Sequence, residues 1–136
     1  MATASKKLPG SLSNNPDLDL WIGINTDGTL TVRSGKVEIG QGLKTAAAQV
    51  AAEELDVSLT RVRIKTADTA ESADENVTSG SRSMEVSATA LRFAAAECRA
   101  IMLDMAAERL KVDKDTLSVD DGTITSPATN QQLTYW

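Results

Sequence analysis

The sequence of 136 residues predicts an α+β fold with the element order β-β-α-β-α-β-β. Three observations support this prediction. Short alternating apolar runs occur near both ends of the chain, two longer stretches have apolar residues at helical spacing, and glycine or aspartate turns separate them. With 41% hydrophobic residues the chain can build one core, but it is too short for two full domains.

The first two strands are predicted on either side of an Asp-Gly turn. Residues 21–24 and 30–34 alternate between apolar and polar positions, and Asp27-Gly28 lies between them. This dipeptide is a strong hairpin signal because the turn needs positive φ angles. Residues 1–17 are polar and contain two of the three prolines, so we expect an N-terminal arm that docks on a folded segment, residues 18–136.

The first helix is predicted over residues 43–56, where apolar residues recur every three or four positions. Residues 61–65 then alternate between cations and β-branched residues, which indicates a strand reached through a helical crossover. A polar loop over residues 67–80 follows. Its length favours a functional role, because long loops without secondary structure are uncommon in compact domains.

The second helix is predicted to be long and to end near Leu110 or Lys111. Its apolar residues step by three or four through about seven turns. The stepping residues are Ala88, Leu91, Ala95, Cys98, Met102 and Met105. A small closing hairpin is predicted between residues 117–119 and 123–125, around an Asp-Asp-Gly turn.

The composition excludes several classes of function. The chain has no histidine and one cysteine, so it lacks imidazole bases, histidine-activated nucleophiles and the usual zinc ligands. The net charge of −5 argues against nucleic acid or an anionic membrane surface as a partner, because both favour basic patches. The lone Cys98 is expected in the core, and with no long apolar run the sequence indicates a cytoplasmic protein without a membrane span.

Two turns rich in small residues are the candidate ligand sites. Residues 40–42 (Gly-Gln-Gly) precede the first predicted helix, and residues 78–83 (Thr-Ser-Gly-Ser-Arg-Ser) precede the second. Glycine lets backbone N–H groups approach a ligand, and a helix start adds unpaired donors, so both turns could hold an anion. Gln41 could read the donors and acceptors of a heterocycle. If the helices pack side by side, the turns would close on one ligand.

Ordinary structural interpretations stay open for both turns. Residues 40–42 would also suit a plain connection between a strand and a helix, and Ser81 or Ser83 would suit an N-cap of the second helix. Lys36 and Arg82 could each neutralise a phosphate, or lie exposed in solvent. The sequence alone does not separate these alternatives.

The acidic residues of the loop before the second helix invite comparison with a calcium site. Asp68, Glu71, Asp74 and Glu75 lack the central glycine and the terminal bidentate glutamate of an EF-hand loop. We therefore expect a solvated acidic loop, not a metal site.

Nucleotide-binding motifs fit the first turn poorly. A P-loop needs Gly-Lys-Ser/Thr, but here Leu43 separates Gly42 from Lys44-Thr45. A dinucleotide fingerprint needs a third glycine, and Thr45 stands where it would fall. Neither motif accounts for the turn.

An ordered set of segments resembles the molybdopterin-binding subunit of molybdenum hydroxylases, the xanthine dehydrogenase and aldehyde oxidase family. The segments are Leu8–Leu12, Trp21–Gly28, Gly35–Thr45, Ala52–Val57 and Thr66–Thr69. The resemblance runs from about Leu8 to Trp136, and it is greatest to bacterial large subunits of the isoquinoline or nicotinate dehydrogenase type. It implies that the chain is part of a larger molybdopterin-binding domain.

The resemblance also implies which residues contact the cofactor. In the family the Gly-Gln-Gly turn contacts the pyranopterin, and the later small-residue turn passes beside pterin and metal, with the Gly80 backbone nearest the metal. The implied cofactor-binding residues are Gly40, Gln41, Gly42, Thr78, Ser79, Gly80, Ser81 and Ser83. Because the dithiolene of the cofactor holds molybdenum, no metal ligand is needed from a chain without histidine.

The implied reaction is hydroxylation of an N-heterocycle or aldehyde, a small-molecule substrate, with water as the oxygen source. The cofactor is molybdopterin, possibly as its cytosine dinucleotide, and the electrons leave through iron-sulfur clusters on a partner subunit. The family's glycine-rich segment and its glutamate base are absent here, so we assign no catalytic residue within the chain. We expect the remainder of the molybdopterin-binding chain to supply them, and the segment to be inactive alone.

A second interpretation comes from a different class. A split or truncated product could persist as a non-catalytic fragment or interaction module that needs a partner chain to bind cofactor. A partner carrying the missing glycine-rich segment and glutamate would distinguish the two.

Overall fold

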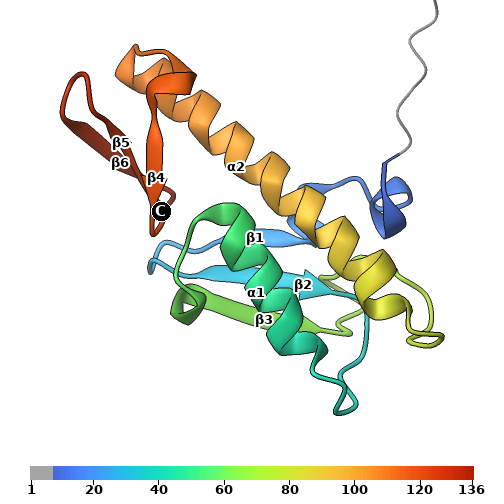
Figure 1. The fold of residues 1–136 in the computed structure, drawn as a ribbon. Coiled ribbons are helices and arrows are strands. Elements are labelled where there is room, and N and C mark those ends of the chain that lie inside the picture. Colours follow the sequence, from blue (N-terminus) through green and yellow to red (C-terminus); the bar gives the residue numbers. More distant parts are fainter. Residues whose placement is uncertain (1–7) are drawn as a thin grey trace, which may run out of the picture.

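A three-stranded sheet forms one layer of the computed structural model, which describes residues 8–136 (Figure 1). Its strands are β1 (Ile22–Ile24), β2 (Leu30–Ser34) and β3 (Val62–Thr66), in the order β1-β2-β3. β1 and β2 are antiparallel across the Asp27-Gly28 turn, which confirms the predicted hairpin. β2 and β3 are parallel, so the predicted helical crossover is also correct.

Two helices cover the same face of this sheet (Figure 1). α1 (Leu43–Leu55) begins after Gly42, whose φ of 80° is left-handed, and ends at Asp56, with φ of 50°. α2 (Thr89–Leu110) ends at Lys111, also in the left-handed region and within the predicted boundary. Left-handed residues of this kind commonly end helices because they redirect the chain and satisfy the last carbonyls.

A second sheet lies toward the C-terminal end of α2 (Figure 1). The predicted closing hairpin is present as β4 (Ser118–Asp120) and β5 (Thr123–Ser126). A third strand, β6 (Gln131–Thr134), pairs with β5 and was not predicted. The strand was missed because its residues are mostly exposed and polar, so they lack the apolar alternation that marks a half-buried strand.

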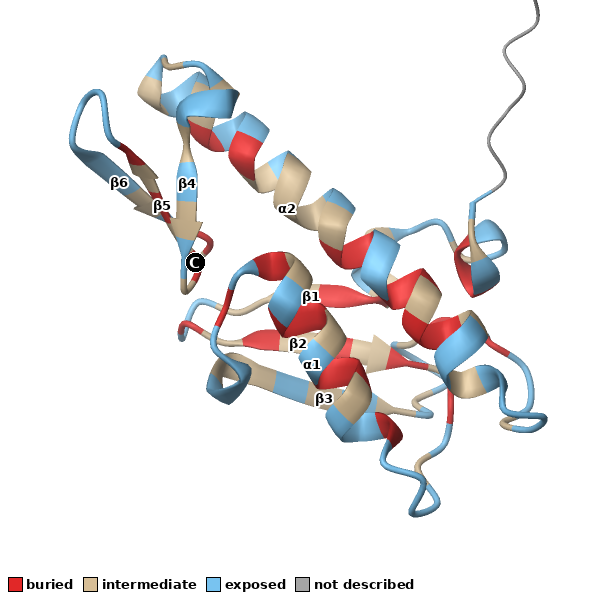
Figure 2. Ribbon diagram, viewed as in Figure 1, coloured by how far each residue is buried: buried red, intermediate tan, exposed pale blue. Residues whose placement is uncertain are grey.

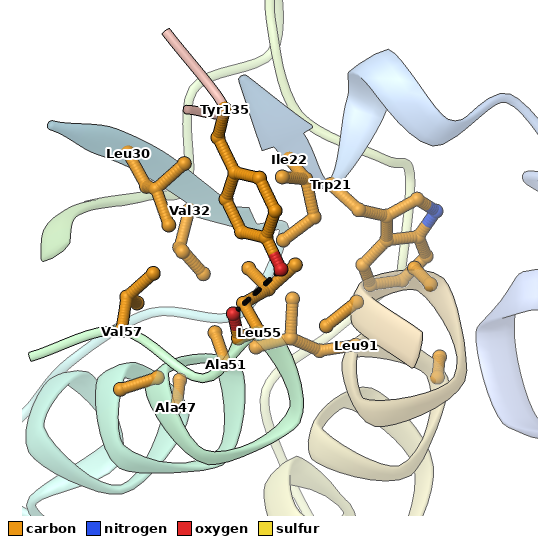
Figure 3. Packing of buried hydrophobic residues seen from close by; sticks show 14 of the residues in the cluster. Trp21, Ile22, Leu30, Val32, Ala47, Ala51, Leu55, Val57, Leu91 and Tyr135 are labelled. Carbon is orange, nitrogen blue, oxygen red and sulfur yellow. Dashed lines mark hydrogen bonds between the residues drawn. The ribbon is translucent and has the colours of Figure 1, made fainter. Parts of the chain in front are cut away.

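The core lies between the first sheet and the inner faces of both helices, where the buried residues gather (Figure 2). Trp21, Leu30 and Leu55 are among its largest fully buried side chains. The second sheet joins this core through Tyr135, whose hydroxyl donates to the Leu55 carbonyl at 3.0 Å (Figure 3). One continuous core therefore connects both sheets, which supports the α+β fold class predicted from the sequence.

Two details of the second predicted helix are wrong. Met105 is 59% exposed, because Leu103 and Ala106 occupy the inward face and an α-helix turns about 100° per residue. The segment Ser83–Ala88 is a π-helix (η4) that leads into α2, where a regular first turn was expected. π-Helical turns are rare and often occur at functional sites.

Further short elements complete the described chain. The 3-10 helices are η1 (Gly10–Ser13), η2 (Leu18–Leu20), η3 (Leu59–Arg61) and η5 (Lys114–Thr116). η1 contacts α2, while residues 1–7 of the predicted arm lie outside the described residues. Between residues 8 and 136, no helix combines the length and apolar character needed to cross a membrane.

Cys98 lies half-buried on α2 and packs against the core. Burial, with the nearby Glu97 charge as a smaller cause, raises the pKa of its thiol to about 11. A thiol with so high a pKa is a poor nucleophile at neutral pH, which agrees with the predicted packing role.

Candidate functional site

The first turn is organised by a carboxylate of the chain itself. Glu38 Oε1 accepts hydrogen bonds from the backbone N–H groups of Gly40 (2.7 Å) and Gly42 (3.1 Å), and its Oε2 accepts from that of Lys44 (2.9 Å). The Lys44 hydrogen bond is the largest cause holding the pKa of Glu38 below its ordinary value, and the two glycine N–H groups add to it. These are the donors that a helix start offers to an anion.

Glu38 therefore occupies the donors that the sequence offered to an external anion, and such an anion would have to displace this carboxylate from the start of α1. The sequence carried no local signal for this contact, since Glu38 lies five positions before Leu43 and outside the first turn, where acidic residues ordinarily stabilise helix starts.

The depressed pKa of Glu38 predicts that the turn depends on pH. A lowered pKa means that the stabilisation is complete above the ordinary carboxyl range and is lost as the pH falls through the lower, folded-state pKa. We expect the Gly40 amide resonance to move with a midpoint below that of an ordinary glutamate, and Glu38→Gln to abolish the movement. NMR titration of the chain measures this, and a midpoint at or above the ordinary value would contradict it.

Gln41 stabilises the same turn with one donor and one acceptor of its side-chain amide. Its Oε1 accepts from the Ile39 N–H at 2.6 Å, and its Nε2 donates to the Val37 carbonyl at 2.7 Å. A primary amide has two donors and two acceptor lone pairs, so one of each is left over. The side chain is exposed, and the remaining donor and acceptor are available to a ligand.

The glycines of both turns present open faces. Gly40 and Gly42 have φ angles of 99° and 80°, and a Cβ atom added to either would meet nothing within 4 Å. Gly80 has φ of 61°, and its nearest neighbour would be Arg82 Cγ at 4.0 Å. The positive φ angles require glycine, and the open space above the backbone leaves room for a ligand of another origin.

The second turn offers hydroxyl groups. Ser79 and Ser81 are exposed, and within residues 8–136 their hydroxyls form no hydrogen bond. Ser83 is half-buried in η4. Neither Ser81 nor Ser83 caps a helix, because Arg82 stands at the N-cap of η4 and makes no side-chain cap bond, so the capping interpretation is wrong.

The residues that lead into the two turns, 36–37 and 77–78, are hydrogen-bonded to each other. The Val37 N–H donates to Thr78 Oγ1 at 2.8 Å, and Lys36 Nζ donates to the Val77 carbonyl at 2.9 Å. α1 also contacts both η4 and α2, as Figure 1 shows for the two helices. α1 and α2 therefore pack against each other, as the hypothesis of two converging turns requires, and closure of the turns on one ligand stays a prediction.

Two charged residues lie in places that the sequence did not indicate. Lys36 is only 3% exposed, so it is neither a solvent-exposed charge nor a free phosphate ligand. Glu75 is 4% exposed, although the acidic loop around it was expected to be solvated. Both were mispredicted because their burial depends on tertiary contacts between segments about 40 positions apart, which no local pattern encodes.

Comparison with known proteins gives these turns a family context. Residues 2–136 match the family model described as a molybdopterin cofactor-binding domain. The chain belongs to this family. The match covers nearly the whole chain and confirms the resemblance found in the sequence.

Relatives of this molybdopterin cofactor-binding chain are long enzyme subunits. A nicotinate dehydrogenase subunit of Pseudomonas putida is 36% identical over 108 residues, which cover 79% of this chain and 9% of that protein. The beta chain of isoquinoline 1-oxidoreductase from Brevundimonas diminuta is 30% identical over 124 residues, covering 86% and 16%. The chain spans only about a sixth, or less, of these relatives.

A solved structure supports the same family fold. The reconstituted CO dehydrogenase from Oligotropha carboxidovorans superposes with a TM-score of 0.72 at 28% identity, over 83% of this chain and 14% of that chain. The structural similarity therefore covers most of the sheet layer and of the helix layer of this chain.

The residues present fit a molybdopterin cofactor. A pterin is a flat ring system edged with donors and acceptors, and the open glycine faces with the spare Gln41 amide groups and free serine hydroxyls suit such an edge. Within the described residues, no cluster of His, Cys, Asp or Glu could hold a metal ion.

Proposed function

We propose that the chain forms one wall of the molybdopterin site in a molybdenum hydroxylase acting on an N-heterocycle or an aldehyde. One observation supports this proposal. Two turns linked by the Val37–Thr78 hydrogen bond have open space above their glycines and side-chain donors and acceptors that form no bond within the described chain. The relatives named for nicotinate and isoquinoline support an N-heterocyclic substrate in particular.

The residues of this chain would bind and orient the pterin. Gly40 and Gly42 would let the ring system approach the backbone, and the spare Gln41 donor and acceptor would read its edge. Thr78, Ser79, Gly80, Ser81 and Ser83 would line the opposite side. When bound, the cofactor supplies the molybdenum at which water-derived oxygen is transferred to the substrate and electrons are collected.

Other parts of the enzyme would complete the chemistry. The rest of the molybdopterin-binding subunit would supply the general base and the substrate pocket, and an iron-sulfur subunit would take the electrons. The description of several relatives as subunits supports this division. We also propose the cytosine dinucleotide form of the cofactor and a cytoplasmic location, the latter favoured by the single, half-buried Cys98.

Replacing Gln41 with alanine tests the proposed role of the first turn. Loss of one donor and one acceptor to the pterin, about 1.4 kcal/mol together, corresponds to a roughly tenfold weaker retention of the cofactor. Molybdenum and pterin content of the complete complex, measured after extensive dialysis, reports the effect. Gln49→Ala is the matched control, because Gln49 is also exposed but lies along α1 away from the turn. Equal retention in both variants would contradict the proposal.

A non-catalytic interaction module is the alternative, and one observation favours it. Ile39 and Val77, at the two turns, are 78% and 74% exposed, which is typical of side chains that a partner covers. A complex that lacks this segment yet carries a full complement of molybdenum would support the alternative and exclude a role in holding the cofactor.

A further inference from the structure

Glu75 is a buried carboxylate on an otherwise exposed acidic loop, and it reaches toward three other segments. Its Oε2 accepts from the Gly35 N–H at 2.8 Å, from Ser34 Oγ at 3.0 Å and from Ser87 Oγ at 2.7 Å. Ser34 ends β2, Gly35 begins the connection to the Gly40–Gly42 turn, and Ser87 belongs to η4. One oxygen atom thus links the end of β2 and the connection before the first turn to η4, which follows the second turn.

A lysine from the opposite side reinforces this junction. Lys36 Nζ donates to the Glu75 carbonyl at 2.6 Å and to the Val77 carbonyl at 2.9 Å. Lys36 belongs to the first connection and Val77 to the loop that leads to the second turn, so the bonds cross between them. Lys36 Nζ thus satisfies two backbone carbonyls of the loop, and replacing Lys36 would leave both acceptors without this partner.

Gly35 lets the two backbones meet at this junction. A Cβ atom at position 35 would lie 2.2 Å from the Ala73 carbonyl oxygen and 3.1 Å from the Glu75 backbone nitrogen. The loop around residues 73–75 therefore lies so close to Gly35, where the connection from β2 to α1 begins, that any residue with a Cβ atom would clash. The junction is a fixed contact and not a chance approach of two loops.

Glu75 is not arranged for stability alone. Its second oxygen, Oε1, is buried and has no hydrogen-bond partner within the described part of the chain. Buried carboxylates cost free energy on desolvation, and an unsatisfied oxygen adds to that cost. A neutral glutamine or an apolar residue would avoid the charge, so the carboxylate calls for a role beyond packing.

We propose that Glu75 is the positioning residue that holds the Gly40–Gly42 turn and the Thr78–Ser83 turn at the separation the cofactor needs. It acts through Gly35, Ser87 and Lys36 and does not touch the cofactor itself. This inference rests on the proposed function, since it assumes that both turns hold the pterin.

The test compares Glu75→Ala and Glu75→Gln in the complete complex. The measurements are molybdenum and pterin retained after dialysis, and the Mo(V) electron paramagnetic resonance signal of the fraction that stays loaded. We expect Glu75→Ala to lower retention at least tenfold and to alter the signal, because the turns are no longer fixed. Glu75→Gln keeps an acceptor for the Gly35 N–H, so it should restore at least half of the retention.

Glu71→Gln is the matched control, because Glu71 lies in the same loop but is exposed and pairs with Lys65 at 2.6 Å. Its retention and signal should equal those of the wild type. If Glu75→Ala yields no folded complex, Ser87→Ala removes one of the three hydrogen bonds and should shift retention and signal in the same direction, by a smaller amount.

The outcomes separate the inference from the proposed function. A merely structural role would give fewer loaded molecules with an unchanged signal, and this result overturns the inference. If Gln41→Ala loses cofactor while both Glu75→Ala and Ser87→Ala keep it with an unchanged signal, the inference fails and the proposed function stands. If the Gln41 variant also keeps its cofactor, the proposed function itself fails.

Discussion

Replacing Trp21 with alanine is expected to destabilise the fold by about 3–5 kcal/mol, the usual range for deleting a large buried aromatic side chain. Trp21 is fully buried in the core (Figure 3), and its Nε1 donates to the Asn15 carbonyl at 2.9 Å. The change removes apolar contacts, leaves a cavity and orphans that carbonyl. Denaturant unfolding of the chain measures the free energy of unfolding.

Two variants sharpen this prediction. Trp21→Phe keeps most of the ring but loses the hydrogen bond, so it should cost clearly less than the alanine variant. Trp136→Ala removes a partly buried indole that stacks on the Arg61 guanidinium at 4.5 Å, and we expect a smaller loss of about 1–2 kcal/mol. Equal losses for Trp21→Ala and Trp136→Ala would show that the core is not centred on Trp21.

Replacing Gly35 with alanine should destabilise the fold by about 3 kcal/mol, the upper end of typical overpacking costs. The new Cβ would lie 2.2 Å from the Ala73 carbonyl oxygen, which belongs to backbone and cannot rotate away. The loop that carries Glu75 must then move as a whole. Both unfolding free energy and cofactor retention should fall.

Gly23→Ala is the control for this change. Its Cβ would also be close to a neighbour, at 2.9 Å, but that neighbour is the Arg33 guanidinium at the end of a flexible side chain. We expect a loss below about 1 kcal/mol, because the guanidinium can shift. A Gly35→Ala variant as stable as Gly23→Ala would mean that the loop is free to retreat from β2.

Much of the fold follows from local pattern. The Asp27-Gly28 turn predicts its hairpin because the dipeptide accepts the positive φ that the turn needs, and α1 follows from apolar residues at helical spacing. β6 does not follow, because Gln131 and Gln132 pair through backbone groups that every residue has. Met105 shows the same limit, since a step of three from Met102 to Met105 and a step of four to Ala106 both fit helical spacing, and it is Ala106 that is buried.

The place of the two candidate turns in the fold was predictable from the sequence, whereas the contacts that hold them were not, and their role in binding cofactor stays a prediction. Glycine before a helix start marks both turns, whatever surrounds them. The roles of Lys36 and Glu75 depend on which distant segments meet, and their side chains look like ordinary surface charges in the sequence. The brace that Gln41 forms on its own turn was likewise hidden, because the residue type fits either a ligand contact or a turn bond.

The carboxylate of Glu38 at the start of α1 has a thermodynamic consequence for cofactor insertion. By holding three backbone N–H groups, it fixes the first turn before any ligand arrives. The conformational entropy of those residues is therefore lost when the chain folds and not when the cofactor binds. For the proposed cofactor site this means that the ordering of the first turn does not fall on cofactor binding, and more of the contact energy would remain as affinity.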